Sequence, residues 1–512
     1  MSGSQFDIAI IGGGINGCGI ARDAAGRGLS VFLCDMGDLA GATSSASTKL
    51  IHGGLRYLEL YEFRLVREAL IEREVLLRSA PHIISPLRFI LPHHRGLRPW
   101  PVIRLGLFLY DHLGGRRLLP PTRSVDLDSD PAGRGLKKTY RRAFEYSDCW
   151  VEDSRLVVLN ARDAADRGAE IRTRTKCVEA RRTGATWHLT MEDQRDYRRF
   201  TIEARALVNA GGPWASEVIT AIAGLNAPAP VRLVKGSHIV VDRLFDHDRA
   251  YIFQNSDGRV CFAIPFEHDF TLIGTTDEDF EGDPATAAAT EAEKDYLLAS
   301  VGEYLDRPLT RDMIRWTYAG VRPLYDDGAS KAQEATRDYV LSLDTVGGKA
   351  PLLSVIGGKI TTFRRLAEQA LKGLAATFPQ MRGAWTASAS LPGGDVPVTA
   401  FAGWIDDAVR RHPALDPRLI ARLCRAYGSR ISAVLAGVSG PVHLGRDFGA
   451  GLSEREVDYL VANEWAETAD DILWRRSRLG LRFTPDQRAA LDQYLAASIK
   501  KPMTSAAAGR AS

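Results

Sequence analysis

Residues 6–35 contain the pattern that most restricts how this chain can fold. An apolar run at 6–11 leads into the turn Gly-Gly-Gly-Ile-Asn-Gly at 12–17, and a helical stretch then leads to a second apolar run at 29–34 that is followed by Asp35. A strand, a GxGxxG turn, a helix and a second strand with an acidic residue at its end form the dinucleotide-binding unit of a Rossmann fold. We therefore expect an α/β protein with a Rossmann-like nucleotide-binding domain.

The glycines of this turn have separate roles. Gly12 permits the tight turn, Gly14 lets a pyrophosphate approach the backbone, and Gly17 lets the helix pack closely against the strand. The positive end of the helix dipole then faces the pyrophosphate, and Asp35 is placed to bind ribose hydroxyls. Without a ligand, the chain would carry the entropic cost of these glycines with no return.

The next segment, TSSASTKLIHGGLRY at 43–57, favours FAD over NAD. A nicotinamide-binding Rossmann domain would cross over here to another helix. A hydroxyl-rich loop that runs into a glycine pair suits a large cofactor lying extended across the domain. We therefore expect FAD.

Charge and cysteine content exclude several classes of protein. The 66 Lys and Arg nearly balance the 63 Asp and Glu among 512 residues, so the formal charge of +3 does not indicate nucleic-acid binding. The six cysteines are scattered without a CxxC pair, so we expect no zinc or iron–sulfur site. Their distribution fits a protein of a reducing compartment. No apolar run approaches the roughly 20 residues of a membrane span, and the first residues have no basic leader pattern. We expect a cytoplasmic protein.

The sequence resembles the aerobic, FAD-dependent glycerol-3-phosphate dehydrogenases, within the D-amino-acid-oxidase-like flavoprotein group. The matching blocks keep the family's order along nearly the whole chain, at 11–31, 43–70, 144–157, 207–215, 235–241, 273–277, 318–324, 336–341, 357–368 and 464–481. Asp35 departs from the family pattern, in which Glu is expected, and so shortens the reach to the adenosine ribose. Cys18 and Gly41 replace other small residues.

The resemblance implies three domains in the chain. The FAD-binding domain is expected to be discontinuous, from 1–78, 144–225 and 352–378. A substrate domain at 226–351 has the alternation of an antiparallel sheet, and TASASLPGG at 386–394 is typical of a linker to an all-helical C-terminal domain at 395–500. We expect this last domain to serve packing or dimerisation, with the protein a homodimer.

The family motifs also imply the residues that bind the cofactor. They are Gly12, Gly14, Gly17, Asp35, Thr43, Ser45, Ser47, Lys49, Leu50, His52, Gly53, Gly54, Val178, Ala210, Gly211, Trp214, Gly358, Lys359 and Thr361.

Glycerol 3-phosphate, the substrate that the resemblance implies, needs cations for its phosphate and a group that takes the proton of the C2 hydroxyl. Arginine suits a phosphate because its planar fork donates paired, charge-assisted hydrogen bonds. The candidates are Arg56, Arg322 and Arg337, with Tyr57 nearby. The alternative is that each arginine pairs with a structural carboxylate.

His238 and Lys359 are the further catalytic candidates. A histidine titrates near neutral pH and suits a general base, although a lone histidine on a strand is more often a satisfied core residue. Lys359 follows a glycine pair, so its ammonium is placed to polarise the flavin or the substrate oxygen. The residues alone do not divide the roles among His238, Lys359 and Arg322.

Residues 79–143 are expected to form a membrane-facing insertion. The apolar stretch at 100–110 lies among Arg88, Arg95, Arg98, Arg104, Arg116, Arg117 and Arg123, with Asp111 as the acid between them. Aromatic and apolar side chains flanked by arginine are typical of an in-plane anchor on anionic lipid. The alternative is a core helix capped by surface arginines.

The resemblance therefore implies an enzyme that oxidises sn-glycerol 3-phosphate to dihydroxyacetone phosphate by hydride transfer from C2 to FAD. It then reduces membrane quinone at the inner face of the cytoplasmic membrane. The alternatives are an oxidase of the same substrate that produces hydrogen peroxide, an amine or amino-acid oxidase of the same fold, and a flavin-binding redox sensor.

Overall fold

The first of two large sheets is mainly parallel and contains the nucleotide-binding unit. The computed structural model describes residues 4–59, 61–225, 231–255, 257–326, 328 and 338–499. Strand β1 (Ser4–Ile11) lies in the middle of this sheet, paired in parallel with β2 (Val31–Cys34) and β10 (Arg199–Asn209). The strand order is β17 (Val340–Asp344), β18 (Leu352–Ile356), β10 (Arg199–Asn209), β1 (Ser4–Ile11), β2 (Val31–Cys34) and β7 (Glu170–Arg172), and β8 (Thr175–Thr183) and β9 (Thr186–Asp193) extend from β10.

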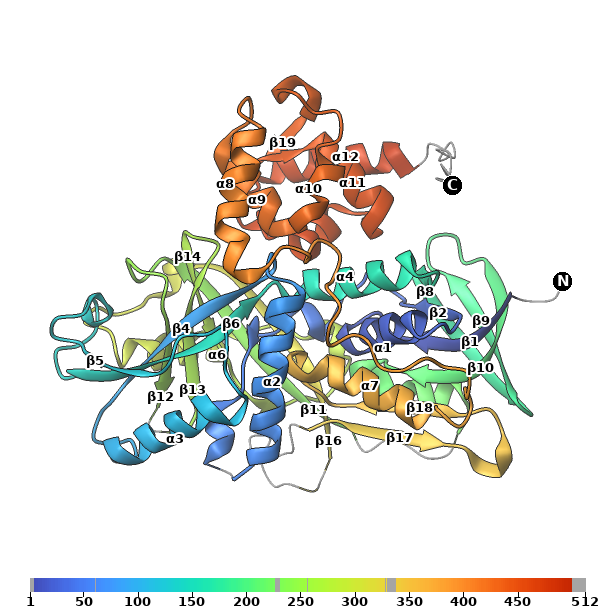
Figure 1. Cartoon of the computed structure of the whole chain (residues 1–512), viewed down its shortest axis with the longest axis horizontal. Coiled ribbons are helices and arrows are strands. Elements are labelled where there is room, and N and C mark those ends of the chain that lie inside the picture. Colours follow the sequence, from blue (N-terminus) through green and yellow to red (C-terminus); the bar gives the residue numbers. More distant parts are fainter. Residues whose placement is uncertain are drawn as a thin grey trace.

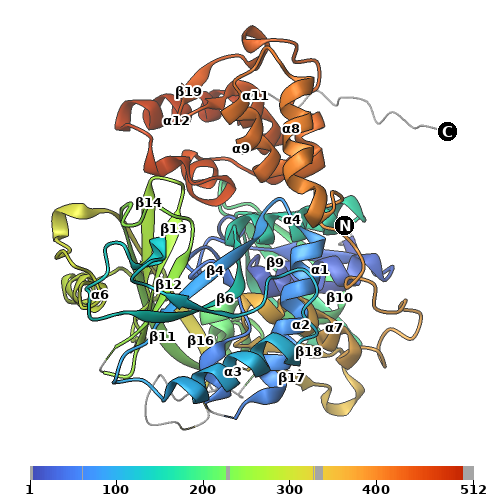
Figure 2. The same ribbon diagram turned by 60° about the vertical axis from the view of Figure 1, so that its left-hand side comes forward.

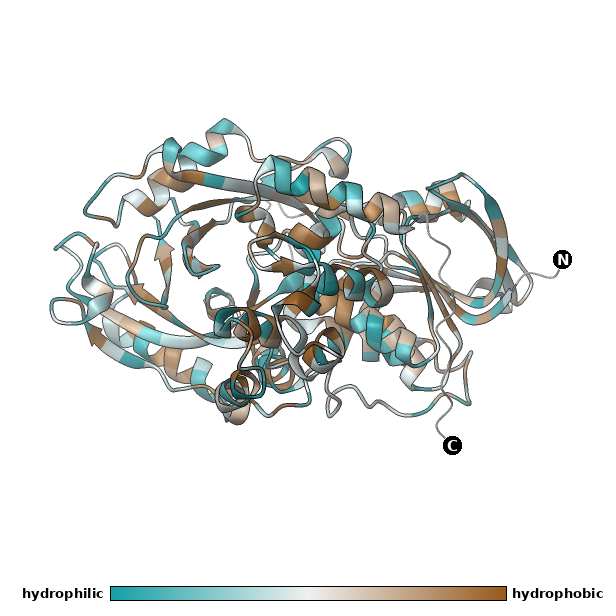
Figure 3. Cartoon of the chain, turned by 90° about the horizontal axis from the view of Figure 1, so that it is seen from above, coloured by the Kyte–Doolittle hydropathy of each residue, from teal (hydrophilic) through white to brown (hydrophobic). Residues whose placement is uncertain are grey.

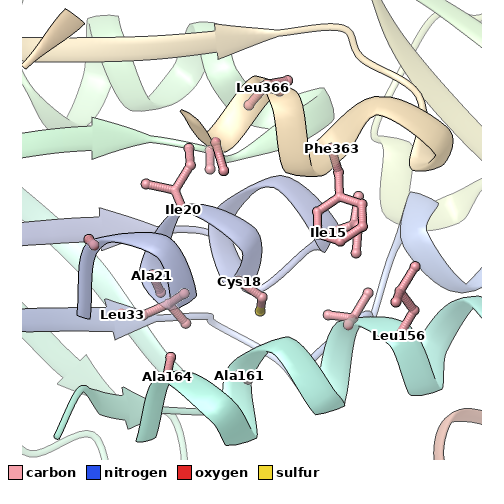
Figure 4. Close-up of a cluster of buried hydrophobic side chains, with 14 of the residues drawn as sticks. Ile15, Cys18, Ile20, Ala21, Leu33, Leu156, Ala161, Ala164, Phe363 and Leu366 are labelled. Atoms are coloured by element: carbon pink, nitrogen blue, oxygen red, sulfur yellow. The ribbon is translucent and has the colours of Figure 1, made fainter. Parts of the chain in front are cut away.

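Helix α1 (Ile15–Gly26) is buried between α4 (Asp153–Asp166) and α7 (Phe363–Gly373). Its small residues allow this, since a Cβ at Gly19 would lie 2.7 Å from the Phe363 ring. Figure 4 shows the packing of Ile15, Cys18, Ile20 and Ala21 with Leu156, Ala161 and Ala164 on one side and Phe363 and Leu366 on the other. The start of α1 is therefore fixed by packing on both flanks.

The second sheet is mostly antiparallel and faces the first (Figure 1). Only its β12–β4 pair is parallel among the pairings described. Its order is β15 (Glu278–Asp279), β11 (Val231–Asp242), β14 (Phe270–Gly274), β13 (Val260–Phe266), β12 (Ala250–Gln254), β4 (Ile84–Pro92), β6 (Arg142–Val151) and β3 (Leu50–Ile51), with β16 (Ile314–Tyr325) on β11 and β5 (Arg123–Asp126) on β6.

Helices flank this sheet on its outside. They are α2 (Phe63–Ser79), α3 (Trp100–Leu113) and α6 (Glu291–Gly302), and the short α5 (Ala215–Glu217) follows β10. Seen from above, the outer helices carry both hydrophilic and hydrophobic residues (Figure 3). No helix in the described part of the chain is both long enough and apolar enough to cross a bilayer.

The predicted domain boundaries are wrong where strands from different segments join one sheet. β4 and β5 come from 79–143 and β6 from 144–225, yet all three belong to the antiparallel sheet. β17 comes from 226–351, yet it pairs with β18 in the parallel sheet. The reason is that β6 is buried along nearly its whole length although it contains Glu145, Ser147 and Asp148, and it pairs on both sides. Its order of apolar and polar residues therefore does not indicate which sheet it joins.

The C-terminal region is helical, as predicted, with one small hairpin. Its helices are α8 (Phe401–Arg411), α9 (Pro417–Tyr427), α10 (Ile431–Val434), α11 (Glu454–Glu464) and α12 (Pro485–Ile499), and the hairpin is β19 (Asp447–Gly449) with β20 (Leu452–Ser453). It has its own core around Ile420, Leu460 and Ile472. Figures 1 and 2 show it at the end of the molecule opposite α3.

His82 lies where the C-terminal region meets the body of the protein, and it predicts acid sensitivity. It is buried beside Gly393 and Gly428, and neither ring nitrogen bonds to a described residue. Burial, helped by the Arg155 cation, lowers the pKa of His82 to about 3. Below about pH 6.5 His82 is protonated in the unfolded chain but stays neutral in the folded protein. As the pH falls from there towards 3, the free energy of unfolding should therefore decrease by up to about 1.4 kcal/mol per pH unit.

In the His82→Gln variant, unfolding should take up about one proton fewer than in the wild type, so the free energy of unfolding should depend less steeply on pH. Urea unfolding between pH 4 and pH 7 measures it, with His443→Gln, at an exposed position, as the control. A slope for His82→Gln equal to that of the wild type would show that His82 does not carry the effect.

Candidate functional site

A cavity of about 1410 Å³ lies between the two sheets. Residues of the glycine-rich turn line one part, and residues of β12, β13 and β16 line another. This volume exceeds the roughly 300–1,000 Å³ of ordinary small-molecule pockets. It therefore suits a ligand with several connected parts.

The glycine-rich turn brings the backbone of β1, α1 and β10 into close contact. Gly12 has φ of +114°, and a Cβ there would lie 2.3 Å from the Ala210 carbonyl oxygen. A Cβ at Gly17 would lie 1.9 Å from the Gly12 oxygen, whereas a Cβ at Gly14 would meet only the Ser44 hydroxyl, at 3.2 Å. Gly12 and Gly17 are thus required by the fold itself, and Gly14 leaves space in the cavity.

Asp35 lines the far end of the cavity from β2. Its carboxylate accepts hydrogen bonds from the Gly13 amide at 2.7 Å and the Gly37 amide at 2.8 Å. Burial raises the pKa of Asp35, and these two donors offset part of the rise. Each oxygen can still accept a further bond, which suits ribose hydroxyls.

The loop at 43–50 lines the middle of the cavity with Thr43, Ser47 and Leu50 among others. Lys49, however, does not line it. Its ammonium is fully buried and lies 2.8 Å from the Asp153 carboxylate and 3.0 Å from the Ser45 carbonyl oxygen. The structure therefore gives Lys49 the role of holding the loop in place, which departs from the predicted contact with the cofactor.

Arg322 reaches the cavity from β16 and pairs with Asp277. It also donates to the Thr275 hydroxyl at 3.3 Å. Lys359 lies 3.7 Å from the centre of the Tyr57 ring, and both residues line the same end of the cavity as Arg56. Arg337 lies outside the described residues.

His238 does not line the cavity. It is buried on β11, stacks on Tyr318 at 4.7 Å, and its Nε2 lies 3.0 Å from the Thr48 hydroxyl. Burial, with the Arg322 and Lys49 cations, lowers the pKa of His238 well below its usual value. A neutral histidine behind Thr48 fits the alternative given in the sequence analysis, in which His238 is a packed core residue, and here it supports the loop at 43–50.

A group that sequence reasoning missed lies behind His52. The Asp148 carboxylate lines the cavity, accepts a hydrogen bond from the Tyr110 hydroxyl at 2.8 Å and pairs with Arg73 at 2.7 Å. The Tyr110 hydroxyl in turn accepts one from the Gly53 amide at 2.8 Å. An acid at position 148, inside the matching block at 144–157, was the available signal.

The structure thus separates the predicted site residues into two groups. The cavity is lined by Gly12, Gly14, Asp35, Thr43, Ser47, Leu50, His52, Gly54, Arg56, Tyr57, Ala210, Gly211, Trp214, Arg322, Gly358 and Lys359. The residues that do not line it are Gly17, Ser45, Lys49, Gly53, Val178, His238 and Thr361. Val178 sits at an irregularity of the β8–β9 ladder, between the lining residue Cys177 and Glu179.

These features fit an extended dinucleotide better than a small metabolite. The cavity passes from Asp35 and Lys176, past Gly14 and Gly211, to Gly358. The two ends and the glycine-rich middle correspond to an adenosine, a pyrophosphate and a second ring system. Comparison with known protein families agrees, because the FAD dependent oxidoreductase family matches residues 7–364.

The chain belongs to the FAD dependent oxidoreductase family. Residues 384–502 match a second family, the C-terminal domain of alpha-glycerophosphate oxidase. FAD is therefore the cofactor of this flavoprotein, and the glycine-rich turn, Asp35 and the loop at 43–50 are the parts of the chain that fit it.

Individual relatives cover almost the whole flavoprotein. A glycerol-3-phosphate dehydrogenase of Pseudomonas aeruginosa is 53% identical over 96% of this chain and 95% of its own length. A D-erythritol 1-phosphate dehydrogenase of Brucella abortus is 51% identical over 95% of this chain and 97% of its own. The solved glycerol-3-phosphate dehydrogenase from Bacillus halodurans, complexed with FAD, has a TM-score of 0.76 at 26% identity and covers 98% of this chain and 95% of its own.

Gly14→Val should give a folded protein that has lost most of its FAD. The new side chain enters the cavity and meets only a flexible serine hydroxyl, so the fold tolerates it while the pyrophosphate does not. Flavin absorbance per protein and thermal unfolding of the purified variant measure both effects. Gly17→Val is the comparison, and it should lower the unfolding temperature as well; full FAD content in Gly14→Val would contradict the placement of the pyrophosphate.

Proposed function

We propose that this flavoprotein oxidises sn-glycerol 3-phosphate to dihydroxyacetone phosphate and passes the electrons to a membrane quinone. The observation that carries the proposal is that three cationic side chains, Arg56, Arg322 and Lys359, line the cavity. A dianionic phosphate needs more than one cation, whereas the single carboxylate of an amino acid needs one and an amine needs none. The name of the Pseudomonas aeruginosa relative supports the same substrate.

These three cationic side chains are not equivalent, which favours separate roles in substrate binding. The Arg56 side chain is exposed, and no described residue forms an ion pair with its guanidinium. Arg322 already has its charge balanced by Asp277 and has further donors to offer. We assign the phosphate to Arg56 and Lys359, and we assign to Arg322 a hydrogen bond to the C2 oxygen.

Bound FAD supplies the hydride acceptor, and a neutral group must take the proton of the C2 hydroxyl. Among the described cavity-lining residues, His52 suits this because burial, with the Lys359 and Arg73 cations, lowers its pKa and keeps it neutral. Its amide donates to the Thr361 hydroxyl at 3.2 Å, which fixes the backbone at this point. His238, which does not line the cavity, is assigned to support of Thr48.

The Brucella abortus relative makes a four-carbon substrate a specific second candidate. Glycerol 3-phosphate and erythritol 1-phosphate share a phosphate on a terminal carbon and a neighbouring secondary hydroxyl. The cation group would bind either one, so the substrate must be decided by measurement.

We also propose that α3 docks on a membrane surface. Its outer face exposes Val102, Leu105 and Phe108, at 47%, 59% and 56% of their full area, while Leu107 and Tyr110 point inward. Figure 2 shows α3 beside α2 at the bottom of the molecule. An apolar helix face of this kind, with the exposed Arg104 at its edge, suits the headgroup region of a bilayer.

Some of the arginines predicted to meet lipid have protein partners instead. Arg88 and Arg123 pair with Glu145. Arg116 donates to the Leu119 carbonyl oxygen and lies 3.9 Å from Asp111. The cations that remain for a headgroup on this stretch include Arg104 and Arg117, both exposed.

Glycerol 3-phosphate should bleach the flavin under anaerobic conditions. The Arg322→Ala variant should lower kcat/KM by at least about tenfold, because it loses a charge-assisted hydrogen bond of roughly 1.5–3 kcal/mol. FAD content should not change. The Arg322→Ala/Asp277→Ala variant controls for the carboxylate left without its partner.

The rates of flavin reduction by glycerol 3-phosphate, erythritol 1-phosphate, glycerol and an amino acid identify the substrate. The losses caused by Arg322→Ala with each of them identify the substrate group that Arg322 contacts. A similar loss with glycerol places Arg322 at the C2 oxygen, and a loss confined to the phosphate esters places it at the phosphate. Bleaching by the amino acid alone would overturn the proposal, and rapid peroxide formation in air would make the enzyme an oxidase.

Leu105→Glu/Phe108→Glu should release the protein from vesicles of anionic lipid, because two charges would have to enter the interface. Dye reduction by substrate should persist, and quinone reduction in the membrane should fall. Val442→Glu is the matched control, since Val442 is 83% exposed in the C-terminal domain at the opposite end. Sedimentation with vesicles measures the binding, and unchanged binding of the double variant would exclude α3 as the docking face.

A further inference from the structure

One short segment of the C-terminal domain reaches three separate loops of the FAD cavity. We call residues 471–478 the brace; its ionic side chains are Asp471, Arg475, Arg476 and Arg478. None of the three loops is a neighbour of the brace in sequence, and each has cavity-lining residues next to its point of attachment.

The first loop follows β2 and lines the adenosine end with Asp35, Gly37 and Ala40. In its middle, Asp38 turns away from the cavity. The Asp38 carboxylate accepts two hydrogen bonds from Arg476, at 2.6 and 2.7 Å, and one from Arg475 at 2.5 Å. Asp38 and Arg476 are both almost fully buried, so water does not compete for this pair.

The second loop, at 43–50, holds the middle of the cavity. Asp153 fixes it from behind, because it binds Lys49 at 2.8 Å and the Ser47 hydroxyl at 2.8 Å. The same carboxylate accepts a bond from Arg478 of the brace at 2.6 Å. The brace therefore holds Asp153, and through it the loop, by a second buried ion pair, and Glu152, 3.8 Å from Arg478, supplies a negative charge for the added cation.

The third loop joins β7 to β8, and the first residues of β8 after it, Thr175, Lys176 and Cys177, line the adenosine end. Arg174, immediately before these residues, donates to Asp471 at 2.6 Å. Burial would raise the pKa of the Asp471 carboxyl, but the surrounding cations, Arg174 first among them, hold it below its usual range. The amide of Arg174 also donates to the Gly37 oxygen at 2.7 Å, which links the third loop to the first.

We propose that the brace is a clasp for the cofactor: the C-terminal domain holds three cavity loops in the conformation that binds FAD. The inference rests on FAD binding and is independent of which substrate the enzyme oxidises. The residues involved are positioning residues, since Asp38, Asp153 and Asp471 do not line the cavity themselves.

Buried ion pairs suit this role because they fix geometry rather than add much stability. The cost of removing two charges from water offsets most of their attraction, while a misplaced partner is strongly penalised. A loop held in this way has already lost its conformational entropy before the ligand arrives, which raises affinity. Thermodynamic linkage then requires the reverse effect, so that bound FAD holds the C-terminal domain against the body of the protein.

The test compares Arg476→Gln and Asp38→Asn with Arg430→Gln. Arg430 pairs with Asp166 at the end of α4, so it joins the same two parts of the protein without reaching a cavity loop. FAD release from the holoenzyme is followed by flavin fluorescence after dilution. The two brace variants should release FAD about tenfold faster or more, within the usual range of coupling between sites, while flavin reduction by substrate in the protein still loaded should stay within about twofold of the wild type.

Release at the wild-type rate from both brace variants would overturn the proposal, and so would equal acceleration in Arg430→Gln, which would indicate general loosening of the domain. A second measurement needs no variant. Protease cleavage in the linker at 386–394 of the wild type should be several-fold slower with FAD bound than after its removal. Equal cleavage rates would also overturn the proposal, whereas failure of every substrate tested would leave the FAD measurements valid and affect only the assigned reaction.

Discussion

The contact between the Gly12 carbonyl and Gly17 is the constraint on which the rest of the structure depends. A methyl group at position 17 would overlap the Gly12 oxygen, at 1.9 Å, so α1 can press against β1 and β10 only because that methyl is absent. The close approach buries α1 on both sides, which explains the run of glycine and alanine along it. It also places the N-terminus of α1 at the cavity, where the helix dipole can meet a pyrophosphate. One steric requirement thus positions both the core and the cofactor site.

The opposite end of the cavity is governed by charge. Arg322, Lys359 and Arg56 approach from β16, from the turn before α7 and from the glycine pair after β3, so no single domain holds the group. Asp277 balances one of these charges, which leaves a site that attracts a dianion without the cost of several unpaired cations in a cavity. Burial lowers the pKa of both His52 and His238 and keeps them neutral, helped at His52 by the Lys359 and Arg73 cations and at His238 by the Arg322 and Lys49 cations. The arrangement favours an anionic substrate and a neutral proton acceptor together.

Local sequence was enough to predict the elements whose signal is local, and it was insufficient where burial removes that signal. The strand, turn and helix at 6–26 are specified by their own residues, and the cavity includes most of the glycines and hydroxyls named from the motifs. The predicted division into domains did not anticipate which sheets β4, β5, β6 and β17 join, because pairing between distant strands leaves no mark on either strand alone. For Lys49 and His238 a motif predicts proximity to the cofactor, but whether the side chain faces the cavity or turns behind it depends on partners such as Asp153 and Tyr318, which come from elsewhere in the chain. Asp148 shows the reverse case: it lines the cavity and lies inside the matching block at 144–157, but it was not named as a site residue.

The C-terminal domain was predicted to pack or to dimerise, and its own core is consistent with an independent unit. Its contact with the rest of the chain, however, is unusually ionic for a packing surface: Asp38, Asp153, Asp471, Arg476 and Arg478 are all nearly fully buried there. Apolar residues would hold two domains together at a lower desolvation cost and would tolerate small shifts. Carboxylates and guanidinium groups, which must meet at fixed distances and angles, do not tolerate such shifts. An interface built this way is better explained by a need for exact placement of the loops beside it than by a need for adhesion, and those loops are the ones that surround the dinucleotide.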